Sequence, residues 1–429
     1  MGFTSLDLLK ERRFLPLFIT QFFGAFNDNA FKLAMLTLIS YRLTGTQAQS
    51  EFYQAVASAL FIIPFFIFSA VSGQIADKYD KALLTRLIKI FEVLLIIIGG
   101  LGLYLSSIFL MMITLTGMGI HSAFFGPIKY AILPDHLQHK ELLVATGLIE
   151  GSTFLAILLG TTLGTISVGV SFSIPYLAIF MTLLASFLGL FASMFIPSAP
   201  SSAENLKIDI QLWRATLTML KHANNAPGLL VSILTISWFW LVGAVLLTKL
   251  PDYCHYVLGG NTTVFALFLA LFSIGIALGS VWINMILKGS ITLVLVPAAM
   301  LVFSVFIFDI YWSSPTIREE SFSTFMAFFS YLKHWRISID LLMLGFCGGL
   351  FVVPLYTYLQ VASPPEARAR TIAANNIYNS LFMVIGTGIV MLLLHFHVSI
   401  PVVFLFFSIL NAVVALILWV YLSKNNISK

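Results

Sequence analysis

Charged residues are scarce in this chain, and their scarcity excludes a water-soluble fold. Only 10% of the 429 residues are Asp, Glu, Lys or Arg, whereas 59% are hydrophobic, and the mean hydropathy is +0.98. A soluble domain of this size would have to expose much of that apolar surface to water. The composition therefore predicts a polytopic membrane protein.

Cysteine and catalytic motifs are also nearly absent. The two cysteines, Cys254 and Cys347, fall in different apolar runs, which gives neither a disulfide framework nor a metal-ligand spacing. The sequence has no Gly-x-Ser-x-Gly elbow, no phosphate-binding glycine-rich loop and no His-Glu-x-x-His. The net charge of +5 is spread over short loops, which argues against nucleic-acid binding. We therefore expect no enzyme, no metal and no cofactor other than a possible coupling cation or proton.

What the chain has in abundance is long apolar runs. A helix needs about 20 residues to cross a bilayer, and twelve such runs can be counted, which predicts an all-α protein with both termini on one side. The runs are approximately 14–41, 52–76, 83–105, 107–127, 143–170, 173–197, 228–251, 262–287, 290–312, 338–361, 371–395 and 400–422.

The distribution of Lys and Arg decides the orientation. If the termini are cytoplasmic, most basic residues fall on inner segments, including the four counted from Lys78 to Lys89 and the C-terminal Lys424 and Lys429. Because basic residues concentrate in cytoplasmic loops, this bias predicts cytoplasmic termini. Only five fall on outer segments: Arg42, Lys249, Arg318, Lys333 and Arg336.

The longest inner break divides the chain into two halves. We expect a six-helix half over 1–197, a cytoplasmic linker over 198–227 and a second six-helix half over 228–429. The linker carries a helical apolar stripe, which indicates either an interfacial amphipathic helix or a plain surface helix. The stripe consists of Leu206, Ile210, Trp213, Leu217 and Leu220.

A polar group interrupts the first apolar run near its middle. Asp28 stands between two asparagines, Asn27 and Asn29, and four residues before Lys32. An uncompensated charge at mid-membrane costs roughly 2.5–3.5 kcal/mol on insertion scales. Two interpretations stay open: Asp28 and Lys32 neutralise one another and lock the helix in place, or they line a polar cavity that binds substrate.

The break between the second and third runs carries a recognisable motif. It reads Gly73-Gln-Ile-Ala-Asp77-Lys78-Tyr-Asp80-Lys81 and resembles the loop signature of the major facilitator superfamily, with Asp80 where glycine is usual. An acid at a helix end can pair with cations of a neighbouring helix. We interpret Gly73, Asp77 and Lys78 as gating residues; the alternative is an ordinary basic inner loop.

Further polar residues interrupt corresponding runs of the two halves. Lys129 and Glu150 belong to the fourth and fifth runs, where they form either a structural pair or a subsite at which Lys129 attracts a phosphate. Asn375, Asn376 and Asn379 lie in the eleventh run, as substrate ligands or as contacts between helices.

Together these stretches resemble one family. Gln21-Phe-Phe-Gly-Ala-Phe-Asn-Asp-Asn, the Gly73 motif, Phe125-Gly-Pro-Ile-Lys-Tyr and Ala369-Arg-Thr-Ile-Ala-Ala-Asn-Asn are similar to segments of bacterial lysophospholipid transporters of the major facilitator superfamily. They also resemble the transporter domain that is fused to acyltransferase and acyl-carrier-protein synthetase domains in some bacteria.

The resemblance implies a fold and a function. It implies two six-helix halves around a central cavity in the bacterial inner membrane, and inward movement of lysophospholipids such as lysophosphatidylethanolamine for reacylation. Membrane lipid and a separate acyltransferase would then be partners. The substrate-binding residues would be Asp28, Asn29, Lys32, Lys129, Glu150, Asn375, Asn376 and Asn379. The alternative is a transporter of another amphipathic molecule, such as a drug or a siderophore.

Overall fold

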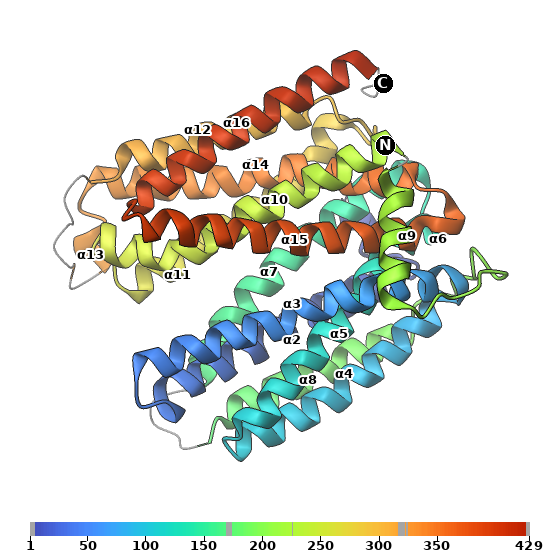
Figure 1. Cartoon of the computed structure of the whole chain (residues 1–429), viewed down its shortest axis with the longest axis horizontal. Helices are drawn as coiled ribbons and strands as arrows, with labels where there is room; N and C mark the ends of the chain where they lie inside the picture. Colours follow the sequence, from blue (N-terminus) through green and yellow to red (C-terminus); the bar gives the residue numbers. More distant parts are fainter. Residues whose placement is uncertain (1–4, 169–173, 225, 316–321, 323–324, 426–429) are drawn as a thin grey trace. The chain divides into compact units, whose positions relative to one another are not determined.

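The structure is a computed structural model that describes residues 5–168, 174–224, 226–315, 322 and 325–425. Every regular element in these ranges is a helix (Figure 1). The long helices are α2 (Leu15–Leu38), α3 (Gln47–Lys78), α4 (Lys81–Tyr104), α5 (Ile108–Ala131), α7 (Leu142–Ser167), α8 (Tyr176–Ser193), α10 (Pro227–Asp252), α11 (Thr262–Leu287), α12 (Val296–Ser313), α14 (Leu332–Ala362), α15 (Arg368–His395) and α16 (Ile400–Asn425). Four are shorter: α1 (Ser5–Leu8), α6 (Leu133–His136), α9 (Leu212–Asn224) and α13 (Phe325–Phe328).

The long helices coincide with the twelve predicted apolar runs, which confirms the all-α prediction. Eleven helices of the described chain are long and apolar enough to cross a membrane. The other long helix, α2, has 24 residues but carries the polar group around Asp28, which lowers its hydropathy. Two charges used for the orientation, Arg318 and Lys429, lie outside the described residues.

The chain folds into two compact units. Unit 1 comprises residues 1–145, 155–230 and 359–377, and unit 2 comprises 146–154, 231–358 and 378–429. Each unit therefore contains a short segment from the opposite half of the sequence, and α15 begins in one unit and ends in the other. The predicted boundaries at 197 and 228 stay a prediction.

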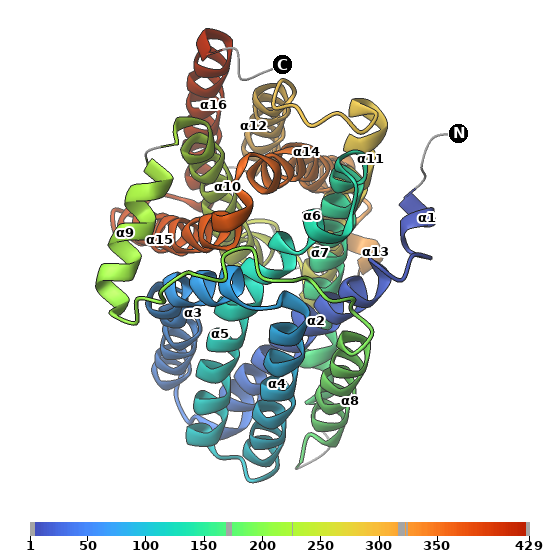
Figure 2. The ribbon, with the colours of Figure 1, turned by 90° about the vertical axis from the view of Figure 1, so that its right-hand side faces the viewer.

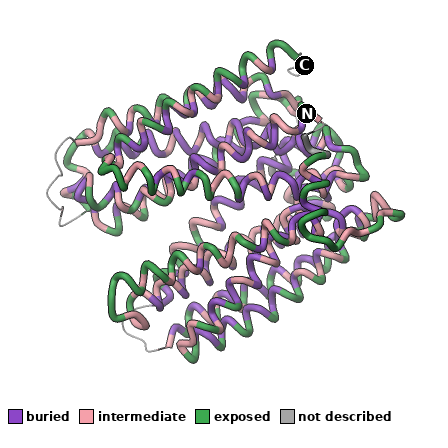
Figure 3. The backbone as a smooth tube through the Cα atoms, viewed as in Figure 1, coloured by how far each residue is buried: buried purple, intermediate pink, exposed green. Residues whose placement is uncertain are grey.

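The helices of unit 1 pack around a buried interior and present apolar side chains outward. Helix α4 contacts α5 and α8, α2 contacts α8, and α3 contacts α5 (Figure 2). Figure 3 shows buried and exposed residues alternating along helices such as α4, as expected where only one face packs. The exposed face of α4 is a stripe of large apolar residues suited to contact with lipid: Leu83, Leu87, Ile90, Leu94, Ile97 and Leu101.

The linker helix differs from the prediction in its start and its buried face. Helix α9 begins at Leu212, so Leu206 and Ile210 precede it. Its buried face carries Ala215 and Met219, not the predicted stripe. Trp213, in that stripe, is 76% exposed. Exposed apolar residues at this place favour the interfacial interpretation.

In unit 2, glycines bring α11 and α14 into close contact. A Cβ atom at Gly275 or Gly279 would lie 2.1 or 2.0 Å from a backbone oxygen of α14, and one at Gly345 would lie 2.2 Å from a backbone oxygen of α11. Gly349 opposes α11 in the same way, with the nearest backbone atoms at 2.5 Å. Each helix thus has two glycines four residues apart, an arrangement that lets helix backbones approach in a membrane.

This interface generates a prediction about stability. Gly279→Ala should force α11 and α14 apart and destabilise the purified protein by about 1–3 kcal/mol, the usual cost of overpacking. The measurement is thermal unfolding in detergent. Gly243→Ala is the matched control, because a Cβ there meets nothing within 4 Å. Equal stability of the two variants would contradict the close contact.

Candidate functional site

The site in unit 1 begins with Asp28 on α2. Its Oδ2 accepts a hydrogen bond of 2.6 Å from the Ser122 hydroxyl of α5. Its other oxygen, Oδ1, is buried and has no hydrogen-bond partner among the described residues. Since a buried carboxylate oxygen without a donor is costly, Asp28 is prepared for a further positively charged or hydrogen-bonding group.

Lys32 lies one turn further along the same helix but does not pair with Asp28. No ion pair within 4.0 Å joins these two residues in the part of the chain that the structure describes. The Lys32 ammonium instead lies over the Phe61 ring, 5.6 Å from its centroid. The two side chains are therefore not in direct contact, and both interpretations of this pair stay open.

The two flanking asparagines have different roles. Asn29 donates its side-chain amide to the Ala25 carbonyl of its own helix at 2.8 Å. Asn27 is fully buried and donates to Oε1 of Glu92 on α4 at 2.9 Å. Asn27 therefore ties α2 to α4, whereas Asn29 remains beside Asp28 on the half-buried side of the helix.

A cluster of charged residues that the sequence analysis missed lies next to Asp28. Lys89 donates a hydrogen bond to Oε2 of Glu92, and Nε2 of His121 lies 3.1 Å from the same oxygen. Lys89 and Glu92 are fully buried, and His121 is 2% exposed. Lys89 was counted among the charges of the inner segments, but it lies on the third turn of α4 and is paired inside unit 1.

Glycines make room for this cluster. A Cβ at Gly24 of α2 would lie 3.0 Å from the Lys89 ammonium, and one at Gly189 of α8 would lie 3.0 Å from its Cε. The signal that could have revealed the cluster is the three-residue spacing of Lys89 and Glu92, which places both on one side of a helix.

Lys129 and Glu150 belong to different units. Lys129, on α5 of unit 1, is half-buried, with its ammonium 4.7 Å from the centroid of the Tyr130 ring. Glu150, on α7 in unit 2, is fully buried. Beside it, Gly147 and Gly151 pack against α11. Neither the structural pair nor the shared subsite is tested, so both stay predictions.

The three asparagines of α15 also belong to different units. Asn375 and Asn376 belong to unit 1, and Asn379 belongs to unit 2. Asn375 is fully buried, and neither atom of its amide has a hydrogen-bond partner among the described residues. Asn376 packs on α5, since a Cβ at Gly126 would lie 2.7 Å from its Nδ2.

Asn379 is held by other side chains of unit 2. Its Oδ1 accepts a hydrogen bond of 2.8 Å from Ser237 of α10. The Tyr356 hydroxyl lies 3.5 Å from its Nδ2 and also accepts a 2.9 Å bond from the indole of Trp240. Asn379 therefore connects α10, α14 and α15, as the helix-contact interpretation expects.

Two of the predicted gating residues, Gly73 and Asp77, contact the start of α15 within unit 1, and we call this contact between α3 and α15 the clasp. The buried Asp77 carboxylate accepts bonds from the backbone N–H of Ala369 at 2.9 Å and of Arg370 at 3.2 Å, and from Nε of Arg370 at 2.9 Å. A carboxylate is favoured there because the N-terminus of α15 offers free N–H groups and a positive dipole. Gly73 permits the approach, since a Cβ there would lie 2.8 Å from the Arg370 Cα.

Lys78 and Asp80 complete this loop. The Lys78 ammonium lies 5.9 Å from the centroid of the Tyr79 ring. Asp80 precedes α4 as its N-cap, and its carboxylate accepts bonds from the backbone N–H of Leu83 at 2.8 Å and of Ala199 at 3.0 Å. Burial would raise the pKa of Asp80, but these bonds and one from Ser198 outweigh it and hold the pKa below its usual value. With φ at −58°, this position needs no glycine.

A family model described as Major Facilitator Superfamily matches residues 17–329. Lysophospholipid transporter LplT of Photorhabdus laumondii is 25% identical over 424 residues, which cover 96% of each chain. LplT of Pectobacterium carotovorum is 27% identical, over 91% of this chain and 89% of the relative.

Solved structures share the fold. The human organic anion transporter MFSD10 superposes with a TM-score of 0.73 at 14% identity, covering 95% of this chain and 99% of that one. The proton:xylose symporter XylE superposes with a TM-score of 0.68 at 14% identity, covering 97% and 96%.

The buried cluster generates a prediction about pairing. Glu92→Gln should destabilise the protein by about 3–5 kcal/mol, because it leaves the Lys89 ammonium buried without its counter-charge. Adding Lys89→Met should recover much of that loss. Thermal unfolding of the two single variants and the double variant gives the coupling energy. Additive effects would show that the two side chains do not depend on each other.

Proposed function

The chain belongs to the Major Facilitator Superfamily, and from this premise we propose that it transports lysophospholipids across the membrane. The superfamily consists of transporters and not of enzymes. The observation that carries the proposal is that relatives named lysophospholipid transporter align over 91–96% of this chain. The family resemblance noted in the sequence motifs agrees with this match.

The geometry around Asp28 suits a zwitterionic headgroup. Lysophosphatidylethanolamine carries an ammonium and a phosphate on a single-chain lipid. Asp28 presents Oδ1 without a partner among the described residues, and Lys32 is held by an aromatic ring instead of an acid. Opposite charges one turn apart that do not pair with each other can bind the two ends of such a headgroup. Asn29 adds a polar side chain beside them.

The direction and location are part of the proposal. We place the protein in the bacterial inner membrane with cytoplasmic termini, moving lysophospholipid inward to a separate acyltransferase. The concentration of Lys and Arg on the inner segments supports this orientation, and it persists after Lys89 is removed from the count. The Asp28 carboxylate is also the place where a coupling cation or proton would bind.

The orientation can be tested by labelling. Single cysteines at Ser202 and Ser423, introduced after replacement of Cys254 and Cys347, should react only from the cytoplasm. A cysteine at Ser314 should react only from outside. The measurement is modification by a membrane-impermeant maleimide in intact cells and in inverted vesicles. Reaction of Ser202→Cys in intact cells would reverse the orientation or change the helix count.

The function can be tested with purified protein in liposomes. Asp28→Asn should reduce lysophosphatidylethanolamine transport at least about tenfold, a loss of one charge-assisted contact, while thermal stability stays near that of the wild type. Lys32→Met should also reduce transport, and the double variant should not recover it. Recovery in the double variant would make Asp28 and Lys32 a structural pair.

Competition identifies the substrate class in the same assay. Excess lysophospholipid should block uptake, whereas drugs or siderophores should have no effect. If wild-type protein moves another amphiphile that lysophospholipids do not inhibit, the alternative substrate class replaces this proposal. Varying Na⁺ and pH shows whether transport depends on either ion.

A further inference from the structure

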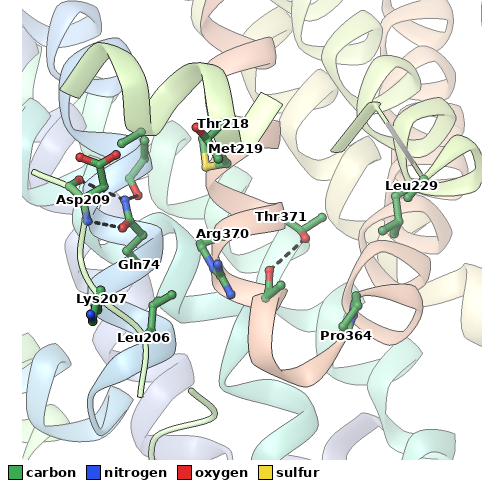
Figure 4. Close-up of a pocket in the computed structure, with 14 residues that line it drawn as sticks. Gln74, Leu206, Lys207, Asp209, Thr218, Met219, Leu229, Pro364, Arg370 and Thr371 are labelled. Atoms are coloured by element: carbon green, nitrogen blue, oxygen red, sulfur yellow. Dashed lines mark hydrogen bonds between the residues drawn. The ribbon is translucent and has the colours of Figure 1, made fainter. Parts of the chain in front are cut away.

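A cavity in unit 1 lies apart from Asp28, beneath the linker helix. Its volume is about 340 Å³, within the range of about 300–1,000 Å³ typical of small-molecule sites. Helix α3 contributes Gln74, α9 contributes Met219, and the start of α15 contributes Arg370 and Thr371. Figure 4 shows Arg370 between Gln74 on one side and Thr371 on the other.

Most polar groups of this cavity are already occupied. Gln74 accepts a bond of 2.7 Å from the backbone N–H of Asp209 and donates to its carbonyl at 3.4 Å. Thr371 donates to the Ala367 carbonyl at 2.9 Å. The Asp209 carboxylate lies 3.4 Å from Nε of Arg214, which offsets its charge. These groups shape the cavity and leave little capacity for a ligand.

Two cationic side chains keep donors for a further anion, although Arg370 is already paired with Asp77. Arg370 uses Nε for Asp77 and Nη2 for the Glu366 carbonyl, and its Nη1 has no hydrogen-bond partner among the described residues. Lys207 is exposed at the rim and has no ion-pair partner within that part of the chain. The unsatisfied donors of the cavity are therefore positive and suited to phosphate or carboxylate.

Apart from Thr218, the rest of the lining is apolar, and the outer side of α9 also exposes apolar side chains. Leu206, Ala215, Met219 and Leu229 form the walls. On the outer side of α9, Trp213 is 76% exposed and accompanied by Arg214 and Lys221. A helix with exposed tryptophan and basic residues is typical of one lying at a membrane interface.

We propose that this cavity binds the anionic headgroup of a membrane phospholipid, with Arg370 and Lys207 holding the phosphate. The first carbons of the lipid occupy the apolar walls, and α9 keeps the opening at the lipid surface. The site is separate from Asp28, so it takes a resident lipid and not the transported molecule.

Occupation of the cavity should favour the closed clasp. One wall comes from α3 and the opposite wall from the start of α15, and Asp77 joins these two elements. Breaking that clasp separates the walls and removes the site. A ligand shifts an equilibrium toward the state it binds better, so an anionic lipid should stabilise the clasp and slow transport.

The test measures lipid binding to the full-length protein. Delipidated protein is titrated with phosphatidylglycerol, phosphatidylcholine, oleate or inorganic phosphate, and native mass spectrometry counts the bound molecules. Phosphatidylglycerol should bind roughly threefold to tenfold more tightly than phosphatidylcholine, as expected for charge-assisted contacts. Equal binding of the two phospholipids would overturn the proposal. Tighter binding of oleate or phosphate would show that the cavity takes a free anion and not a phospholipid headgroup, which would also overturn the proposal.

Single substitutions test whether phosphatidylglycerol binds in this cavity. Met219→Trp, which fills the cavity, and Lys207→Gln, which removes a cation, should each abolish the preference for phosphatidylglycerol. Lys221→Gln is the matched control, an exposed lysine of α9 that does not line the cavity. If the control loses the preference equally, the lipid binds to the general basic surface and the proposal is wrong.

A second readout connects the lipid to the clasp. Phosphatidylglycerol should raise the thermal stability of wild-type protein, and Asp77→Asn should lose that gain while Asp28→Asn keeps it. Loss in Asp28→Asn would mean that the lipid occupies the transport site. Because binding is measured without transport, a wrong substrate assignment leaves this result unaffected.

Discussion

The cost of burying charge governs unit 1. Lys89 and Glu92 lie on the buried face of α4, whose other face is suited to contact with lipid. The charge of each side chain must therefore be neutralised within the protein. Glu92 meets this requirement with Lys89 and Asn27, and with His121 close to the same oxygen, so that α2, α4 and α5 are fixed relative to one another. This fixed frame holds Asp28 beside Ser122 with one oxygen free.

A second constraint is the close approach of helix backbones, which glycine allows. Gly73 lets the start of α15 reach Asp77, and Gly24 leaves space for the Lys89 ammonium. In unit 2 the glycines of α11 and α14 allow contact between backbones. Polar recognition and close packing thus depend on each other, because a side chain at either glycine of unit 1 would displace a charged partner.

The sequence predicted those features that depend on local patterns. Apolar runs located the long helices, and the order of residues around Asp77 indicated a clasp. Hydropathy averages conceal a buried ion pair, which explains why Lys89 was counted with the charges of the inner segments. The partners of Asn379 lie on α10 and α14, more than twenty residues away in sequence, and no local pattern specifies them. The start of α9 was misplaced because an apolar stripe does not itself distinguish a helix from the extended segment before it.

The difference between the two acids of unit 1 explains how one bundle can serve both stability and recognition. Glu92 has donors for both oxygens and contributes no unbalanced charge to its surroundings. Asp28 has a donor for one oxygen, and Lys32 is separated from it by its position over an aromatic ring. Under the proposed function, a headgroup that carries both signs would satisfy Asp28 and Lys32 together without leaving either charge exposed to lipid. The paired cluster of Lys89, Glu92 and His121 therefore makes it possible for Asp28 to keep one oxygen without a partner, because the cluster supplies the rigidity that Asp28 does not provide.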